Sequence, residues 1–307
     1  MMALDALGHP GYAWRYERNV ERLLDPRQQR PRVVDPAWVW RVPFAPLSMA
    51  ETVTAIGDLI EMGRPTFFIT ANTHYVMLSQ QNPDLQVINT QAAFILADGA
   101  PLVWASRCMG SPLPERVAGS DLVFVLSAEA AKQGYRLFFV GAAEGVAEQA
   151  ALRLRELYPG LQVVGTECPS LHELTREEEA ALIGRIRAAR PHILMVAFGQ
   201  PKGERWIYQH LEELGVPVSV QVGASLDFAA GRIRRAPRWM RNSGLEWAFR
   251  LGLEPRRLFG RYVRNAWFIA RMVARDLQQA TGRRRIPHSS SHALPHKQDS
   301  VEGDSLS

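Results

Sequence analysis

Four short stretches decide the fold of this chain: T-A-N-T-H-Y at residues 70–75, F-I-L-A-D-G at 94–99, P-E-R-V-A-G-S-D-L at 114–122 and A-F-G-Q-P-K-G-E at 197–204. Each follows an apolar run that is typical of a buried strand. In an open parallel sheet, ligands bind outside the carboxyl ends of the strands. The sequence therefore predicts one crevice, lined by Thr70, Asn72, Asp98, Arg116 and Gln200. One carboxylate, one guanidinium and several neutral donors suit transfer chemistry on a sugar phosphate.

Apolar strands alternate with helical patterns between residues 48 and 222. We expect strands at 66–70, 94–97, 136–140, 161–165, 192–198 and 218–222, and helices at 48–62, 73–81, 121–132, 143–158, 175–189 and 202–214. Two helix starts carry the spacing of a capping box, Ser48 with Glu51 and Thr175 with Glu178. The alternation predicts an α/β class, a Rossmann-like parallel sheet with helices on both faces, plus a basic helical C-terminal appendage.

Charge is unevenly distributed along the 307 residues, whose net charge is +5. Between Arg232 and Arg285 there are 15 arginines, no lysine and three acids, a net charge of +12, so the rest of the chain carries −7. Such a basic segment indicates an anionic partner: phosphate, membrane or nucleic acid. We expect an N-terminal extension at 1–40, an α/β catalytic domain at 41–231, a basic membrane-associating helical appendage at 232–281 and a disordered tail at 282–307.

The composition excludes several classes of protein. Two cysteines, Cys108 and Cys168, cannot build a disulfide framework, which fits a reducing cytoplasm. The first 30 residues hold charges and no apolar core, unlike a secretory signal. No uncharged apolar run reaches the roughly 18 residues that a spanning helix needs.

Two charged residues are candidates for catalysis. Asp98 follows four apolar residues, so burial is expected to raise its pKa, and a carboxylate there could accept a proton from a sugar hydroxyl. The alternative is that Asp98 caps the next helix. Arg116 could bind a diphosphate bidentately, or could instead pair with Glu115 or Asp121.

Neutral and turn residues are candidates for substrate binding. Thr70 and Asn72 end a strand and could bind a sugar or phosphate, although Asn72 could also cap a helix. Gly141 opens a strand-to-helix turn whose backbone N–H groups could face a nucleotide, or is an ordinary turn glycine. In a second such turn, Gln200 and Lys202 could reach a nucleotide, with a solvated Lys202 as the alternative.

The basic segment has the pattern of an amphipathic helix. Arginines after Pro255 recur on one face, at 257, 261, 264, 271 and 275, beside an apolar stripe. With Trp267 and Phe268 nearby, this pattern is typical of a membrane-surface helix. A helix packed on its own domain with a solvated basic face is the alternative.

The four stretches resemble, in their order and in their residues, motifs of the WecG/TagA/CpsF glycosyltransferases (glycosyltransferase family 26), and the resemblance covers residues 40–265. Members of that family extend lipid-linked sugars in bacterial surface polysaccharide synthesis. The resemblance implies that Asp98 is the catalytic base and that Arg116 acts in the active site beside Thr70, Asn72 and Gln200. It also implies that arginines of the appendage contact the diphosphate of a lipid-linked acceptor, at Arg250, Arg257 and Arg261.

The function implied is an inverting glycosyltransferase, which moves a sugar from a UDP-sugar to a hydroxyl of an undecaprenyl-diphosphate-linked saccharide in exopolysaccharide or cell-surface polysaccharide synthesis. It would work in the cytoplasm, peripherally on the inner face of the bacterial membrane. Because the sequence has no D-x-D triplet and no His/Cys cluster, we expect no metal and no cofactor, with positive charge from arginine, lysine and helix ends.

Other classes are less well supported. A G-x-G-x-x-G turn would favour a nucleotide-binding oxidoreductase, and the sequence has no such turn. A nucleic-acid-binding module could use the basic segment but does not require the crevice residues. A second copy of the chain is a further possible partner, because a neighbouring subunit could cover the crevice.

Overall fold

The computed structural model describes residues 35–169, 174–237, 239–240 and 244–283. Nearly all of the predicted N-terminal extension and of the predicted tail lie outside these residues. The chain divides into two compact units between Ala266 and Trp267, and each is described by itself.

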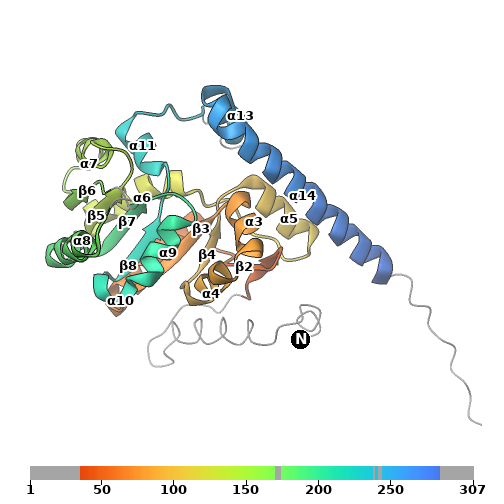
Figure 1. Ribbon diagram of the computed structural model, residues 1–307, viewed down its shortest axis with the longest axis horizontal. Helices are drawn as coiled ribbons and strands as arrows, with labels where there is room; N and C mark the ends of the chain where they lie inside the picture. The colour runs from red at the N-terminus through yellow and green to blue at the C-terminus, as the bar shows by residue number, and fades with distance from the viewer. Residues whose placement is uncertain (1–34, 170–173, 238, 241–243, 284–307) are drawn as a thin grey trace, which may run out of the picture. The chain divides into compact units, whose positions relative to one another are not determined.

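A six-stranded parallel sheet forms the centre of the first unit (Figure 1). Its strand order is β4-β3-β8-β7-β5-β6, and every neighbouring pair is parallel. The strands are β3 (Thr66–Ala71), β4 (Ile95–Ala97), β5 (Arg136–Gly141), β6 (Gln162–Glu167), β7 (Ile193–Ala197) and β8 (Val218–Gln221). The predicted Rossmann-like sheet is therefore confirmed.

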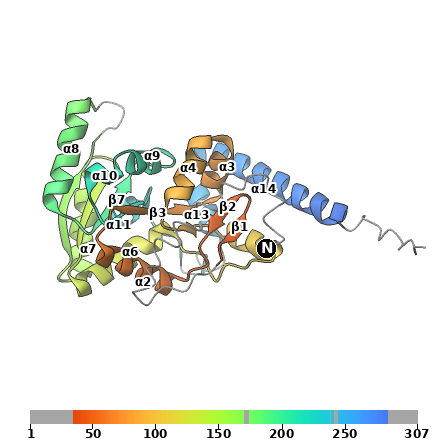
Figure 2. The ribbon, with the colours of Figure 1, turned by 90° about the horizontal axis from the view of Figure 1, so that it is seen from below.

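Helices cover both faces of the sheet (Figure 2). One layer holds α2 (Met49–Met62), α6 (Gly119–Gln133), α7 (Val146–Leu157) and α11 (Ser225–Ala230). The other holds α3 (Thr73–Gln81), α4 (Pro83–Gln91), α8 (Arg176–Ala189) and α9 (Lys202–Gln209). Successive β3 side chains show why both layers are needed. Phe68 stacks on Phe94 at 5.0 Å between ring centroids, while Phe67 meets Tyr208 of α9 at 6.2 Å. Because adjacent side chains point to opposite faces, an apolar run must be covered twice.

The predicted helices are present, with differences at several places. Both capping boxes form, and the helix at 73–81 has the predicted bounds. The helix predicted at 202–214 is divided at His210 into α9 and α10 (Leu211–Leu214). Three short helices without a prediction are α4, α5 (Ala100–Cys108) and α11.

A hairpin begins inside the predicted N-terminal extension. It joins β1 (Ala37–Val39) to β2 (Val42–Phe44) through Trp40 and Arg41, whose φ angles are +47° and +68°. Two-residue hairpin turns need such positive φ values and usually use Asn or Gly. The Trp-Arg pair therefore gave no recognisable turn signal.

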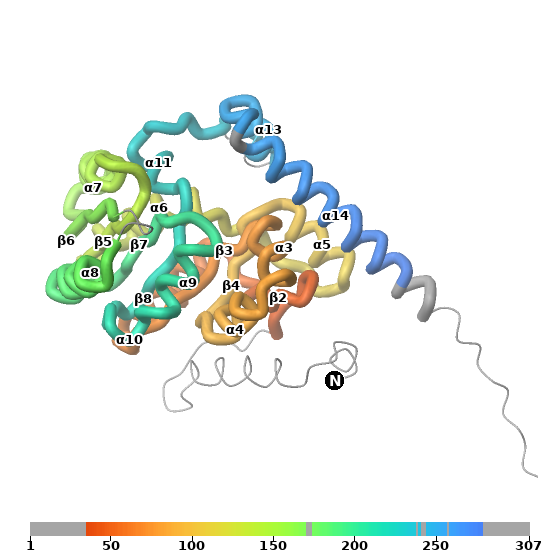
Figure 3. Tube along the Cα trace, in the orientation of Figure 1, coloured from red at the N-terminus to blue at the C-terminus, as the bar shows by residue number. Residues whose placement is uncertain are grey.

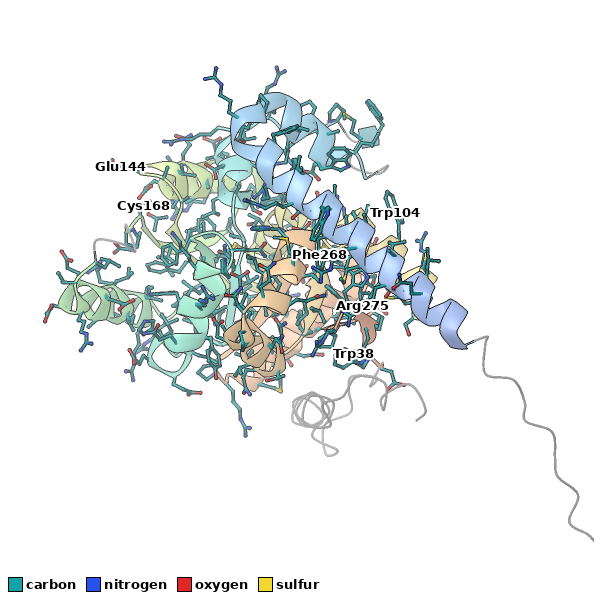
Figure 4. The ribbon with its side chains drawn as sticks, turned by 45° about the vertical axis from the view of Figure 1, so that its right-hand side comes forward. Trp38, Trp104, Glu144, Cys168, Phe268 and Arg275 are labelled. Atoms are coloured by element: carbon teal, nitrogen blue, oxygen red, sulfur yellow. The ribbon has the colours of Figure 1, made fainter. Side chains whose placement is uncertain are left out.

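Most of the described part of the basic segment is helical. The tube in Figure 3 follows the chain into α13 (Glu246–Leu253) and then α14 (Pro255–Arg283), which continues into the second unit. There α14 carries Phe268 and Arg275, labelled in Figure 4, and the Arg271 guanidinium lies 5.5 Å from the centroid of the Trp267 ring. Among the described residues, no helix combines the length and the apolar character needed to cross a membrane.

Replacing Gly141 at the end of β5 should destabilise the fold. Its φ is +96°, and a Cβ there would lie 2.7 Å from the Phe198 ring and 2.9 Å from the Ala197 backbone. We expect Gly141→Ala to lower the free energy of unfolding by about 2–4 kcal/mol, from backbone strain and overpacking, in urea denaturation.

The matched control is Gly184→Ala on the exposed side of α8, where a Cβ meets nothing within 4 Å. It should raise the free energy of unfolding by about 0.5–1 kcal/mol because Ala favours a helix. Equal effects of the two substitutions would contradict the strain assigned to Gly141.

Candidate active site

The ends of β3 and β7 are tied together by the side chain of Gln200. Its Oε1 accepts a hydrogen bond from Asn72 Nδ2 at 2.8 Å, and its Nε2 donates to the Thr70 carbonyl at 3.0 Å. The Thr70 hydroxyl donates to the Gln221 carbonyl at the end of β8, at 3.3 Å. Three of the predicted residues therefore meet at the carboxyl edge of the sheet.

Asn72 caps a helix and also bonds Gln200, while its role in substrate binding stays a prediction. Its Oδ1 caps α3 by accepting from the Tyr75 backbone N–H at 3.0 Å, while its Nδ2 bonds Gln200. Because the two ends of the amide have different partners, capping fixes the orientation in which Asn72 meets Gln200.

Asp98 follows β4 and lies beside the same residues. Its Oδ2 accepts from the Gly119 backbone N–H at 3.3 Å. A Cβ built on Gly119 would lie 3.2 Å from the Thr70 hydroxyl, 3.7 Å from Asp98 Oδ2 and 3.7 Å from the Ser225 hydroxyl. These polar groups therefore converge around one glycine. The N-cap of α5 is Gly99, so Asp98 is not its N-cap residue.

The surroundings of Asp98 raise the pKa of its carboxyl toward neutrality. Burial raises the pKa of the carboxyl to about 6, and the nearby charge of Glu246 adds to this effect. Arg116, the Gly119 N–H and Arg250 act in the opposite direction. A base with such a pKa is largely ionised at pH 7 and can still hold a proton that it accepts.

Arg116 is held by two acids. Its Nη1 lies 3.0 Å from Glu246 Oε2 and its Nη2 lies 3.3 Å from Asp121 Oδ2. Asp121 also pairs with Arg235. Burial disfavours the charged guanidinium, but Asp98, Glu246 and Asp121 outweigh burial and raise the pKa of Arg116. Asp121 was an expected partner, whereas Glu115 accepts from the Met49 backbone N–H instead.

The other predicted residues are less closely tied to this group. Gly141 ends β5 opposite Ala197, and Lys202 is the exposed first residue of α9. The roles of both residues toward a nucleotide stay predictions.

The appendage arginines divide into three cases. Arg250 is close enough to lower the pKa of Asp98, with its guanidinium 5.3 Å from the Phe228 ring centroid. Arg261 acts on His74, whose pKa is lowered by burial and then by this arginine. The side chain of Arg257 lies outside the described residues.

Two acids of this region had no predicted role. Glu246 is the acid of G-L-E-W-A-F-R, and Glu204 stands four residues after Gln200, one helical turn on. Glu204 is 1% exposed, and neither carboxyl oxygen has a hydrogen-bond partner among the described residues. Burial raises its pKa to about 8, against weaker opposing effects that include the Gln200 amide and Arg205. Its burial, which the sequence pattern did not show, makes Glu204 a candidate functional residue.

Within the part of the chain that the structure describes, no three His, Cys, Asp or Glu side chains are grouped so as to hold a metal ion.

Polar side chains at the carboxyl ends of parallel strands, with Asp98 close to Arg116 and Arg250, fit a group-transfer enzyme that handles phosphorylated substrates. A sequence model described as the glycosyl transferase WecG/TagA/CpsF family matches residues 37–282. The chain belongs to this family of glycosyltransferases, as the motifs had indicated.

Two relatives show what the chain is similar to. An N-acetylglucosaminyldiphosphoundecaprenol N-acetyl-beta-D-mannosaminyltransferase of Bacillus spizizenii is 31% identical over 198 residues, 64% of this chain and 75% of the relative. A protein of the same name from Staphylococcus aureus strain NCTC 8325 is 30% identical over 204 residues, 63% of this chain and 78% of the relative.

Glu204 should make the stability of the protein depend on pH. In the folded protein its pKa is about 8, above the ordinary glutamate value of 4.5, so the stability gained from the neutral acid is complete below pH 4.5 and is lost as pH rises through 8. We expect Glu204→Gln to raise the melting temperature more at pH 8.5 than at pH 5.

The control is Glu156→Gln, the same change at an exposed position of α7. Its melting temperature should differ from that of the parent by the same small amount at both pH values. A Glu204→Gln difference that does not vary with pH would show that the carboxyl is ionised throughout.

Proposed function

We propose that this glycosyltransferase moves a hexosyl or N-acetylmannosaminyl group from a UDP-sugar to a hydroxyl of an undecaprenyl-diphosphate-linked saccharide. The observation that carries the proposal is the partly buried Asp98 carboxyl, set beside Thr70 and within the influence of Arg116 and Arg250. A base and positive charge are the two requirements for displacing a nucleoside diphosphate with an alcohol. The names of the two relatives supply the sugar class and the acceptor class.

The proposed reaction is a single displacement. Asp98 takes the proton of the acceptor hydroxyl while that oxygen forms a bond to C1 of the donor sugar. The bond between C1 and the diphosphate oxygen breaks, and the electron pair leaves with UDP. Attack opposite the leaving group inverts the configuration at C1.

Arginines would stabilise the charge that develops on the leaving diphosphate. Arg116 is partly buried, where hydrogen bonds to a phosphate are worth more than in water. We assign a similar role, toward the donor or the acceptor diphosphate, to Arg250, Arg257 and Arg261. Thr70, Asn72 and Gln200 would orient a sugar, and Gly141 with Lys202 would face the nucleotide.

The proposed acceptor is held in a membrane, so the enzyme would work at the membrane surface. The arginines and aromatic residues of α14, including Trp267 and Arg271, suit contact with anionic headgroups. We place the enzyme peripherally on the inner face of the bacterial membrane, in exopolysaccharide or cell-surface polysaccharide synthesis.

The proposed activity is tested by UDP release from a panel of UDP-sugars with a short-chain polyprenyl-diphosphate GlcNAc, in the presence of EDTA. We expect release that requires both substrates and survives EDTA, because the proposed catalytic groups are side chains. Release without acceptor would indicate hydrolysis, and loss of release in EDTA would contradict metal independence.

Asp98→Asn tests the base. The substitution keeps the shape and removes the proton acceptor, so kcat should fall by about 100- to 10,000-fold. In the parent enzyme, kcat/KM should rise with pH through about 6, since the base works only when ionised. A folded Asp98→Asn variant with parental turnover would refute this mechanism.

A further inference from the structure

Glu246 is an acid at the start of α13, inside the most arginine-rich part of the chain. Its carboxylate lies 3.0 Å from Arg116 across a sequence separation of 130 residues, and the residue is 9% exposed. A buried acid so placed must be paired to be tolerated. The pairing joins the basic segment to the strand-end site.

The contact belongs to an alternating chain of charges. Arg235 pairs with Asp121, Asp121 with Arg116, and Arg116 with Glu246. Each terminal nitrogen of Arg116 is therefore bound to a different acid. Because a guanidinium is planar, two such anchors fix both its position and the direction of its plane.

Glu246 does not exhaust the binding capacity of Arg116. A guanidinium has five N–H donors, and the two contacts to Glu246 and Asp121 leave others for a phosphate. An anchored arginine with free donors suits a group that must meet a phosphate in one orientation. A contact that only blocked the arginine would be expected to occupy more of its donors.

We propose that Glu246 is a positioning residue of this glycosyltransferase, whose carboxylate orients Arg116 beside Asp98 and thereby links α13 to the reacting centre. This inference rests on the proposed function. By this inference the basic segment contributes to the site through an acid, Glu246, as well as through its arginines.

Charge near Asp98 gives the proposal a distinctive signature. The charged groups that act on Asp98 are Arg116, Glu246 and Arg250, and the Gly119 N–H bonds it directly. Asp121 and Arg235 act through Arg116. Glu246 raises the pKa of Asp98, whereas Arg250, one turn further along α13, lowers it.

The experiment compares pH–rate profiles of UDP release for the full chain and three variants. In Glu246→Gln we expect a plateau lower by about 10- to 100-fold, because a misplaced catalytic group can cost about 100-fold. We also expect the acid limb to move to lower pH, since a negative charge is lost. Glu246→Asp should lower the plateau and leave the acid limb in place, because the charge remains. The control Glu156→Gln, on the exposed surface of α7, should match the parent in both respects.

Three results would overturn the proposal. If Glu246→Gln had the same plateau rate and the same acid limb as the parent, Glu246 would not act on the site. A lower plateau with an unmoved limb would reduce Glu246 to a structural role. A higher rate or a lower KM for the lipid-linked acceptor would mean that Glu246 obstructs Arg116.

A titration without turnover separates this inference from the proposed function. The carboxyl ¹³C signal of Asp98, assigned with Asp98→Asn, should titrate near pH 6 in the parent and at lower pH in Glu246→Gln. That shift without any UDP release would support the coupling while refuting the transferase reaction tested. UDP release by Glu246→Gln together with an unchanged Asp98 titration midpoint would support the transferase reaction and refute the coupling.

Discussion

The burial of one carboxyl group at the end of β4 constrains the rest of the site. Asp98 is held where loss of water raises its pKa to about 6, and this position requires positive charge close by to keep the carboxylate available. Arg116, which supplies part of this charge, is itself partly buried and is paired with Asp121 and Glu246. Each charge in the group therefore depends on the next one.

The neutral side of the site follows a different principle. Gln200 joins two strands through its amide, and Asn72 can meet it only because the other end of its own amide caps α3. Hydrogen bonds of this kind add rigidity without adding charge, so they fix positions without altering the pKa of Asp98 through a net charge. Geometry and electrostatics are thus assigned to separate residues.

Much of this arrangement could be predicted from the sequence, because strand ends in a parallel sheet must meet at one edge. Long apolar runs identified the sheet, and the polar residues after them identified Thr70, Asn72, Asp98 and Gln200. The predicted divisions of the chain into domains stay predictions.

What the sequence did not reveal depends on tertiary contacts. The short helices α4, α5 and α11 have weak periodicity, and the hairpin turn at Trp40 and Arg41 lacks the usual residues. Glu246 looked like one acid among many arginines, and only the folded structure brings it to Arg116. Nothing in the local pattern around Glu204 distinguished a neutral buried acid from an ordinary helical glutamate.

The Gln200 bridge and the Arg116 pair also govern when the site can form. Asn72 and Gln200 are 128 residues apart, and Arg116 and Glu246 are 130 apart. Contacts of such high sequence separation form late, after loop closure has been achieved. During synthesis, Asp98 and Arg116 emerge long before Glu246 and Arg250, so the site cannot be completed until α13 has left the ribosome. A shortened nascent chain would therefore contain much of the sheet and lack a complete active site.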